Sequence, residues 1–241
     1  MYSLDDIKVT LLNKEEAKNF IFNHGRVACV CYDTDEKHAE KVGEKCLESG
    51  HTSGSRGDYF VFEIECPRFT ADQIMRHEIG VFKNCQSQRY VVMDEFDCYV
   101  DPVILENRKL KSLYEASIET TQLCYKYIRI ELERLGITGE AANDVMRTLL
   151  PIGVPTKLRI GFDIEALINL MGKRLCTRAD APAHRVAILM RKEVLAVEPR
   201  YAEYLVPQCK SKLYCPEHKG CGAYPSKKEL QEIIKNYKKG E

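Results

Sequence analysis

The chain has 241 residues, of which 44% are hydrophobic and 30% are charged, and its 36 basic residues balance its 36 acidic residues. A chain of this length can bury a sizeable core, in one large domain or two small ones. The absence of net charge and of any apolar run near the roughly 18 residues of a membrane span argues against nucleic acid or membrane as a partner. The eleven cysteines and the acidic N-terminal region favour a reducing, cytoplasmic location.

The first half of the chain is predicted to alternate between short helices and strands. Apolar residues at helical spacing predict helices, and runs of β-branched or alternating apolar residues predict strands. Thr70 is a suitable N-cap for one of these helices. The predicted helices cover 14–23, 36–49 and 71–77, and the predicted strands cover 27–33, 58–66 and 89–93.

The second half is predicted to be mostly helical. Apolar residues recur at helical spacing from 107 to 135, and Gly136 ends this long helix. Ser226 is placed to open a helix at the C-terminus. Because strands and long helices are partly segregated along the chain, the sequence predicts an α+β fold. The other helices are predicted over 140–150, 163–175 and 183–196.

Residues 74–90, IMRHEIGVFKNCQSQRY, combine many hydrogen-bonding groups with apolar residues. A core element would not bury the arginine, histidine and asparagine unpaired, so the segment is interpreted as a helix end and loop facing a buried polar ligand. In an extended chain, Ser87 and Arg89 point to the same side. Such a pair suits a phosphate, because arginine gives a bidentate, charge-assisted contact. The alternative is a surface arginine beside a turn serine.

Two further arginines lie on apolar helices. Arg147 precedes Leu149 and Leu150, and Arg174 ends the predicted helix over 163–175. Arginines in such surroundings are rarely buried unless they are paired. They either bind an anionic ligand or form structural salt bridges, with Asp144 or Glu165 as candidate partners.

The polar segment resembles the signature of flavin-dependent thymidylate synthases, usually written RHRxxSxNxxSxRY. Here Arg76 and His77 are followed, after one inserted residue, by N-x-x-S-x-R-Y over 84–90. Gln73, three residues before Arg76, also matches the family pattern. The resemblance covers residues from about 50 to about 180. GHTS at 50–53 is similar to the family's flavin segment. The other two matching stretches are MRTLLP at 146–151 and RLCTRA at 174–179.

The resemblance implies an α+β domain over 1–207 with an antiparallel sheet and long helices, assembled as a homotetramer with active sites between subunits. It also implies the reductive methylation of dUMP to dTMP. The implied cofactor is FAD, with methylenetetrahydrofolate and NADPH as co-substrates. Because flavin carries the redox chemistry, the protein's part is chiefly to position rings and tune charge.

The resemblance also assigns roles to individual residues. An arginine near a uracil carbonyl would stabilise negative charge that develops on the ring, and Arg174 is assigned to this catalytic role together with His51. The residues assigned to the nucleotide are Gln73, Arg76, Ser87, Gln88, Arg89, Arg147 and Arg174. The residues assigned to the flavin and folate region are His51, Ser53, Arg76, His77, Glu78, Asn84, Asp163 and Asn169.

Several positions depart from the family pattern, mostly on the flavin and folate side. We favour a divergent but active thymidylate synthase with re-paired charges. The alternatives are a member that acts on another uridine nucleotide or with altered chemistry, and a non-catalytic nucleotide-binding homologue. The departures are Arg56 for a glutamate, Glu78 for the second arginine of RHR, Phe82 for a serine, Cys85 for an acidic residue, Asp163-Ile164-Glu165 for N-A-R, and Ala179-Asp180-Ala181-Pro182 for A-Q-W-E.

The cysteines suggest two further hypotheses. Cys85, beside the substrate loop, could attack the pyrimidine, although a small buried hydrophobe is the commoner role of a free cysteine. The C-terminal extension over 208–241 holds a compact set of thiols and one imidazole whose spacing could supply four ligands to a structural Zn²⁺. The alternative for this set is unpaired thiols in a loop. Its members are Cys209, Cys215, His218 and Cys221.

Overall fold

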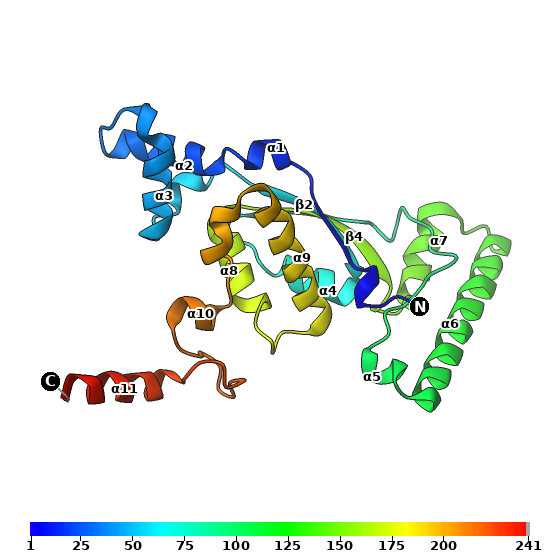
Figure 1. The fold of residues 1–241 in the computed structure, drawn as a ribbon. Coiled ribbons are helices and arrows are strands. Elements are labelled where there is room, and N and C mark those ends of the chain that lie inside the picture. Colours follow the sequence, from blue (N-terminus) through cyan, green and yellow to red (C-terminus); the bar gives the residue numbers. More distant parts are fainter. Residues whose placement is uncertain (240–241) are drawn as a thin grey trace. The chain divides into compact units, whose positions relative to one another are not determined.

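A computed structural model of the chain describes residues 1–239, and within these residues four strands form one sheet. The sheet order is β1-β2-β4-β3, and Figure 1 labels its two central strands, β2 and β4. The amide of Arg68 donates to the carbonyl of Val154, and that of Phe69 to Ile152, so β2 and β4 run antiparallel. The predicted α+β fold with an antiparallel sheet is therefore confirmed. The strands are β1 (Lys8–Leu11), β2 (Phe60–Pro67), β3 (Val81–Cys85) and β4 (Pro155–Phe162).

The two central strands alternate buried and more exposed positions, as the period of two in a strand requires. Phe60, Phe62 and Ile64 of β2 are at most 1% exposed, and Leu158 and Ile160 of β4 are fully buried. Burying a side chain of this size contributes about 1.5–3 kcal/mol, so each of these positions stabilises the sheet.

The chain divides into two compact units, and each strand contributes residues to both. Unit 1 consists of Met1–Lys8, Glu63–Arg76 and Lys83–Arg159. Unit 2 consists of Val9–Phe62, His77–Phe82 and Ile160–Glu241. The predicted boundary between 1–207 and 208–241 stays a prediction.

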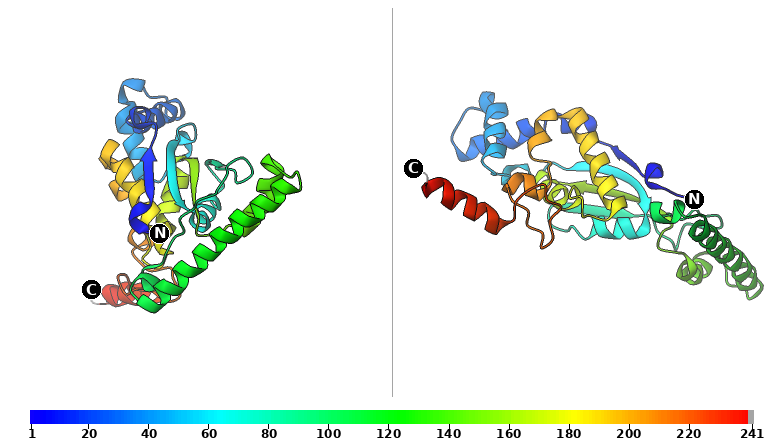
Figure 2. Two further views of the ribbon diagram at one scale, coloured as in Figure 1. Left: turned by 90° about the vertical axis from the view of Figure 1, so that its right-hand side faces the viewer. Right: turned by 60° about the horizontal axis from the view of Figure 1, so that its bottom comes forward.

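Unit 1 is built around a long helix, α6 (Arg108–Arg134), which Figure 2 shows along its length. The side chain of Asn107 caps it by accepting from the amides of Lys109 and Leu110, and Gly136 follows its end with φ +74°. These bounds confirm the helix predicted over 107–135. The unit also contains η1 (Leu4–Asp6), α4 (Arg68–Met75), α5 (Pro102–Leu105), α7 (Gly139–Met146) and η4 (Arg147–Leu149), and its core holds Phe96, Tyr125, Leu132, Ala142, Met146 and Val154.

Unit 2 contains a pair of helices whose backbones touch. α2 (Phe20–Cys31) packs on α3 (Ala39–Glu48) through two glycines. A Cβ added at Gly25 would lie 1.7 Å from the carbonyl oxygen of Ala39, and one at Gly43 would lie 2.0 Å from that of Ile21. The close approach of the two helices therefore requires glycine at both positions.

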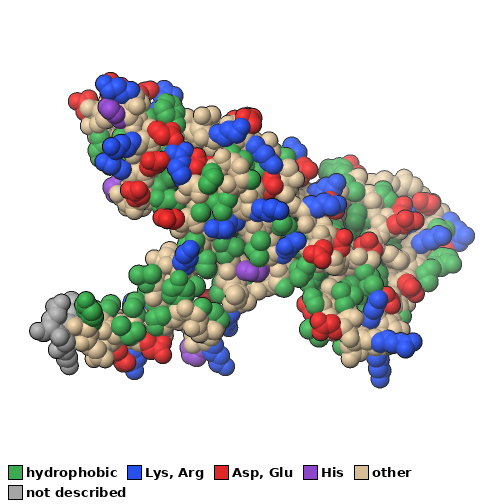
Figure 3. All heavy atoms as spheres, viewed as in Figure 1, with side chains coloured by type: hydrophobic (Ala, Val, Ile, Leu, Met, Phe, Trp, Pro, Cys, Tyr) green, Lys and Arg blue, Asp and Glu red, His purple; other side chains and the backbone are tan. Residues whose placement is uncertain are grey.

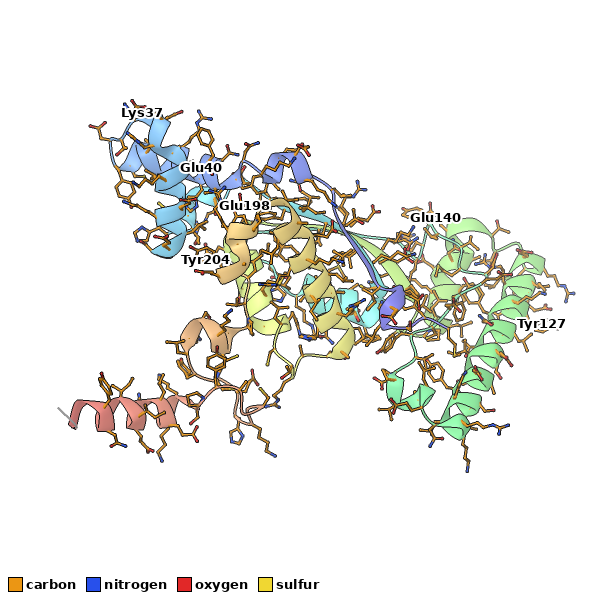
Figure 4. The ribbon with its side chains drawn as sticks, viewed as in Figure 1. Lys37, Glu40, Tyr127, Glu140, Glu198 and Tyr204 are labelled. Carbon is orange, nitrogen blue, oxygen red and sulfur yellow. The ribbon has the colours of Figure 1, made fainter. Side chains whose placement is uncertain are left out.

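The rest of unit 2 places two packed helices after β4. α8 (Ile164–Arg174) and α9 (Ala181–Val197) pack on each other, and both were predicted. Arg200 forms ion pairs with Glu40, Glu44 and Glu198, which tie α3 to the segment after α9; Figure 4 labels Glu40 and Glu198. The remaining elements are α1 (Lys14–Ala17), η2 (Glu36–His38), η3 (Ser53–Ser55), η5 (Pro199–Glu203), α10 (Gln208–Lys212) and α11 (Lys227–Lys239), the last of which begins after Ser226 as predicted.

Several predicted elements are wrong. The strand predicted over 27–33 is the second half of α2 and the turn after it, because packing against α3 overrides the local β-propensity of its valines and cysteines. Thr70 lies inside α4, whose N-cap is Pro67. The helix predicted over 140–150 ends at Met146 and continues as the 3₁₀ turn η4.

The polar segment also differs from its prediction. The strand is β3, over 81–85, and the residues predicted as a strand over 89–93 lie in a turn, a bend and irregular backbone. β3 pairs with β4, a strand that the sequence reasoning missed together with β1. β4 alternates Lys157 and Arg159 with buried residues, which is the period of a half-buried strand.

The surface fits the balanced composition. Lys and Arg side chains are interspersed with Asp and Glu over the face in Figure 3. In the described part of the chain, every helix falls short of the length or apolar character that a membrane span requires.

Candidate functional site

Two of the predicted nucleotide arginines meet in unit 1. Nε of Arg89 lies 3.0 Å from Oδ1 of Asp144, and Nη2 of Arg147 lies 3.1 Å from the same oxygen. A second guanidinium nitrogen of Arg89 lies 3.7 Å from Glu140, which Figure 4 labels on α7. The arginines are 44% and 47% exposed in their side chains, so an anion from solvent can reach them. The structure therefore brings together Arg89 and Arg147, which are far apart in sequence.

The loop that carries Arg89 is fixed by its backbone. The amide side chain of Asn143 donates to the Arg89 carbonyl over 2.7 Å, and Arg129 donates in turn to Asn143 over 3.1 Å. Asn143 is 5% exposed, so this contact is a buried anchor. The guanidinium of Arg89 is thus presented from a loop held at its main chain.

Ser87 and Arg89 are neighbours in a turn rather than in an extended strand. The amide of Arg89 donates to the Ser87 hydroxyl over 3.2 Å, and the amide of Val91 donates to the Ser87 carbonyl. The extended conformation predicted for this pair is therefore wrong. The turn still suits an anion, because the hydroxyl accepts from the backbone and its own proton can be donated outward.

Arg174 lies in unit 2, at the last position of α8. Its carbonyl lies 2.8 Å from Nδ1 of His184, and the helix before it buries Leu167 and Leu170. Because Arg174 and the pair of Arg89 and Arg147 belong to different units, their predicted convergence stays a prediction.

A cavity of about 180 Å³ in unit 2 contains two of the predicted flavin residues, His51 and Ser53. The Tyr32 hydroxyl lies 3.4 Å from Nδ1 of His51. His24, at 2% exposure, forms another wall, and its burial lowers its pKa below the usual value. The cavity is lined by His24, Val27, Ala28, Cys31, Tyr32, Cys46, His51, Ser53 and Gly54.

Sequence reasoning missed the α2 part of this cavity. His24, Ala28 and Cys31 recur at helical spacing, so they lie on one face of α2. This signal was available in the sequence, but the strand predicted over 27–33 concealed it.

Asp163, another predicted flavin residue, caps α8. Its Oδ1 accepts from the amide of Ala166 over 2.8 Å, and its own amide donates to the Gly80 carbonyl over 2.9 Å. A Cβ on Gly80, whose φ is +69°, would lie 2.3 Å from Oδ2 of Asp163. Asp163 is 4% exposed, and its burial raises the pKa of its carboxyl above the usual value, with Glu165 adding to the effect.

Two of the charge reversals relative to the family pattern pair with each other. Nη2 of Arg56, which replaces a glutamate, lies 3.6 Å from Oε2 of Glu165, which replaces an arginine. Both side chains are more than half exposed, so the contact contributes at most about 1 kcal/mol. The contact places an opposite charge beside each of the two residues that the resemblance treats as reversed.

Cys85 contacts an arginine and a hydroxyl within unit 1. Nη1 of Arg68 donates to its sulfur over 3.4 Å, and the sulfur lies 3.6 Å from Oγ1 of Thr156. Neither contact is a base that could take the thiol proton, so the geometry gives no support to a nucleophilic role.

The other predicted site residues are divided between the units. Arg76, the C-cap of α4, and Asn84 on β3 are exposed, whereas His77 is 9% exposed. Gln73, Arg76, Asn84 and Gln88 belong to unit 1, and His77, Glu78 and Asn169 belong to unit 2.

The four side chains predicted to bind zinc are not assembled as ligands. Within residues 1–239, no group of three or more His, Cys, Asp or Glu side chains is arranged to hold a metal ion. Cys209, Cys215 and Cys221 line one cavity, and His218 is outside its lining.

Comparison with solved structures shows which fold this chain resembles. A solved structure of the UMP/dUMP methylase PolB from Streptomyces cacaoi, bound with 5-Br dUMP, matches with a TM-score of 0.63 and 18% identity, over 85% of this chain and 96% of that one. At this identity the match shows the fold alone.

Sequence relatives are more similar. The flavin-dependent thymidylate synthase of Nitratidesulfovibrio vulgaris is 34% identical over 187 residues, which are 76% of either chain. That of Pyrococcus abyssi is 33% identical over 226 residues, which are 88% of this chain and 90% of the relative. A sequence model described as "Thymidylate synthase complementing protein" matches residues 11–200. Because that match spans most of the chain, the protein belongs to the family of flavin-dependent thymidylate synthases.

Proposed function

We propose that the protein is a flavin-dependent thymidylate synthase that converts dUMP to dTMP, with methylenetetrahydrofolate as carbon donor, NADPH as reductant and FAD as cofactor. The observation that carries the proposal is the meeting of Arg89 and Arg147 at Asp144, beside the hydroxyl of Ser87. Two guanidiniums and a hydroxyl form a site for a nucleotide phosphate. Relatives at about a third identity that carry this activity support the proposal.

The ion pairs of this cluster explain how it can exist without ligand. Asp144 and Glu140 balance the two positive charges, which are at the surface and screened by water. A dianionic phosphate carries more charge than one carboxylate and accepts more hydrogen bonds. We infer that it competes with Asp144 for the arginines and leaves the acid in contact with water.

The residues of the His51 cavity fit one part of FAD. The walls from Val27 and Ala28 are apolar, and Tyr32, His51 and Ser53 supply polar atoms. Its volume, about 180 Å³, is below the roughly 300–1,000 Å³ of sites that enclose a whole small molecule. When bound, FAD supplies the redox chemistry of the reaction.

The protein's own contribution is positioning and charge. Arg89, Arg147 and Ser87 would hold the phosphate, which lowers the entropic part of the barrier by fixing the pyrimidine. Arg174 would stabilise negative charge on the uracil ring, with His51 as the second catalytic residue. The remaining assigned residues, Gln73, Arg76, Gln88, His77, Glu78, Asn84, Asp163 and Asn169, would contact the nucleotide, flavin or folate in a homotetramer whose sites lie between subunits.

A second candidate function is the methylation of another uridine nucleotide. It is favoured by the fold match to a protein whose name gives both UMP and dUMP as substrates. The two candidates differ in whether the 2′-hydroxyl is accepted, so one assay separates them.

The test uses purified full-length protein. We expect a yellow protein, or uptake of added FAD, and a change in flavin fluorescence on titration with dUMP. With methylenetetrahydrofolate and NADPH, dTMP should form from dUMP and be detected by chromatography. Turnover of UMP in preference to dUMP would select the second function. Protein that takes up no FAD and binds neither nucleotide would overturn both.

A further inference from the structure

A cavity in unit 2 has four thiols in its wall. It has a volume of about 250 Å³ and lies where the end of α8, α10 and the segment 213–226 meet. The four cysteines in its lining are Cys176, Cys209, Cys215 and Cys221. Cys176 follows directly after Leu175, the C-cap of α8, so one of the four thiols comes from outside the C-terminal extension.

The segment 213–226 has no buried residue that could anchor it in a core. It contains neither a helix nor a named strand, and most of its residues are exposed. Its ends are joined by an isolated bridge between Cys215 and Ser226, with the amide of Cys215 donating to Pro225 over 2.7 Å. Short segments without a core are commonly held by disulfides or by a metal, and all eleven cysteines are free thiols here.

The segment folds back over one of the sulfurs. A Cβ added at Gly220 would lie 3.0 Å from Sγ of Cys215, so glycine at 220 allows the backbone to approach the thiol closely. Arg178 fastens the same segment to the chain after α8, because it donates to the carbonyl of Lys219 and lies 3.7 Å from Glu217. The thiols from the two parts of the chain are thereby kept around one space.

The charges around the cavity suit bound thiolates. Lys173, Arg178 and Lys210 line it, against one carboxylate, from Glu217. Four thiolates with one Zn²⁺ carry a net charge of about −2, which such cations stabilise. A bound metal ion would deprotonate the four thiols.

We propose that Cys176, Cys209, Cys215 and Cys221 bind one Zn²⁺, which ties the segment 213–226 to the end of α8. The ion replaces four thiol protons, which pass to the solvent. Four protein ligands leave no position for water, so the site is structural. The thiols of the present structure line the cavity without ligating geometry, and binding would draw them inward. Relative to the set predicted from sequence, Cys176 takes the place of His218.

The first test is the metal content of full-length protein purified without chelators, where we expect about one zinc per chain. Cys176→Ser should lose zinc on dialysis against a zinc-buffering chelator, whereas His218→Ala should keep it. Cys124→Ser is the matched control, because Cys124 is an exposed thiol on α6 of unit 1. Retention of zinc in Cys176→Ser with loss in His218→Ala would overturn the proposal.

A second measurement remains informative if the variants fail to fold. Thiols of metal-free wild-type protein are alkylated with and without added Zn²⁺, and the modified cysteines are located by mass spectrometry. Zinc should protect the four cavity cysteines and leave Cys31 and Cys124, the exposed thiols elsewhere, fully reactive. Equal labelling of all the cysteines with and without zinc, or disulfides among the four, would contradict the site. Neither result depends on FAD or dUMP, so the proposed enzyme activity can stand or fail separately.

Discussion

The arginine cluster of unit 1 and the flavin-side segments of unit 2 relate to the family pattern in opposite ways. In unit 1, Arg89 and Arg147 match the family motif, and acids on α7 balance their charge. In unit 2, Arg56 and Glu165 each depart from the pattern, yet they form an ion pair with each other. In this chain, the two residues expected to depart from the family pattern therefore neutralise each other's charge.

The largest expected effect tests how rigid the flavin-side backbone is. Gly80→Ala forces a Cβ against Asp163 at a position with φ +69°, whereas Gly50→Ala, at φ +73°, meets nothing within 4 Å. The left-handed conformation costs about 1–2 kcal/mol in both variants, and the clash adds about 1–3 kcal/mol in Gly80→Ala alone. Urea unfolding of both variants measures the difference. Equal losses of stability would show that Asp163 moves aside freely.

The next effect tests the nucleotide side. Arg89→Ala and Arg147→Ala should each weaken dUMP binding about ten- to a hundredfold, because a charge-assisted hydrogen bond contributes about 1.5–3 kcal/mol. Lysine should restore binding only in part, since it lacks the planar fork. The measurement is flavin-fluorescence titration with dUMP. Arg159→Ala is the control, as Arg159 is an exposed arginine of unit 1 paired with Glu63. If the arginine variants bind dUMP as tightly as the control does, the two arginines only form structural salt bridges.

A smaller effect concerns the pH dependence of Asp163. Its folded-state pKa is raised above 3.8, so the folded protein holds this proton more tightly than the unfolded chain does. The resulting stability is complete below pH 3.8 and is lost as the pH rises through the folded-state pKa. Asp163→Asn, which restores the residue of the family pattern and keeps a capping oxygen, should therefore stabilise the protein on the order of 1 kcal/mol at neutral pH.

Thermal unfolding of both proteins across this pH range is the measurement for Asp163. The advantage of the asparagine variant should shrink towards zero as the pH falls to 3.8. An advantage that is independent of pH would mean that burial does not govern the titration of this carboxyl.

The smallest effect concerns the reversed ion pair. Arg56→Glu and Glu165→Arg each place like charges together, and the double variant restores an attractive pair with the polarity of the family pattern. The coupling free energy should be about 0.2–1 kcal/mol and should decline with salt, because both side chains are exposed. A double-mutant cycle on unfolding free energy measures it, and additive single changes would show that the two charges do not interact.

The sequence predicted most reliably what local periodicity determines. The 27-residue helix α6 was predicted because its apolar residues recur over many turns and Gly136 ends it. The second half of α2 was misassigned because Val27, Val30 and two cysteines favour a strand locally, and the packing of Gly25 on α3 that overrides this preference is a long-range contact.

The residues of the candidate site were predicted only in part, because long-range contacts decide the others. Motif spacing picked out Ser87, Arg89 and Arg147, and Asp144 was foreseen as a partner. The pairing of Arg56 with Glu165 brings together residues more than a hundred positions apart, which neither periodicity nor spacing can place. Spacing along the chain does not group Cys176 with the C-terminal thiols, because only the fold brings the end of α8 beside them.

The contact between α2 and α3 limits which mutations the gene can accumulate at two glycine codons. Every codon for glycine begins with two guanines, and a change at either one specifies a residue with a Cβ or a stop. At Gly25 and Gly43 any such Cβ would fall within 2.0 Å of a carbonyl oxygen on the facing helix. A single-nucleotide change at the first or second base of either codon therefore never gives a residue that fits. A change at the third base leaves the glycine unaltered. We expect a saturation library of the gene, selected for folded protein, to recover only synonymous changes at both codons.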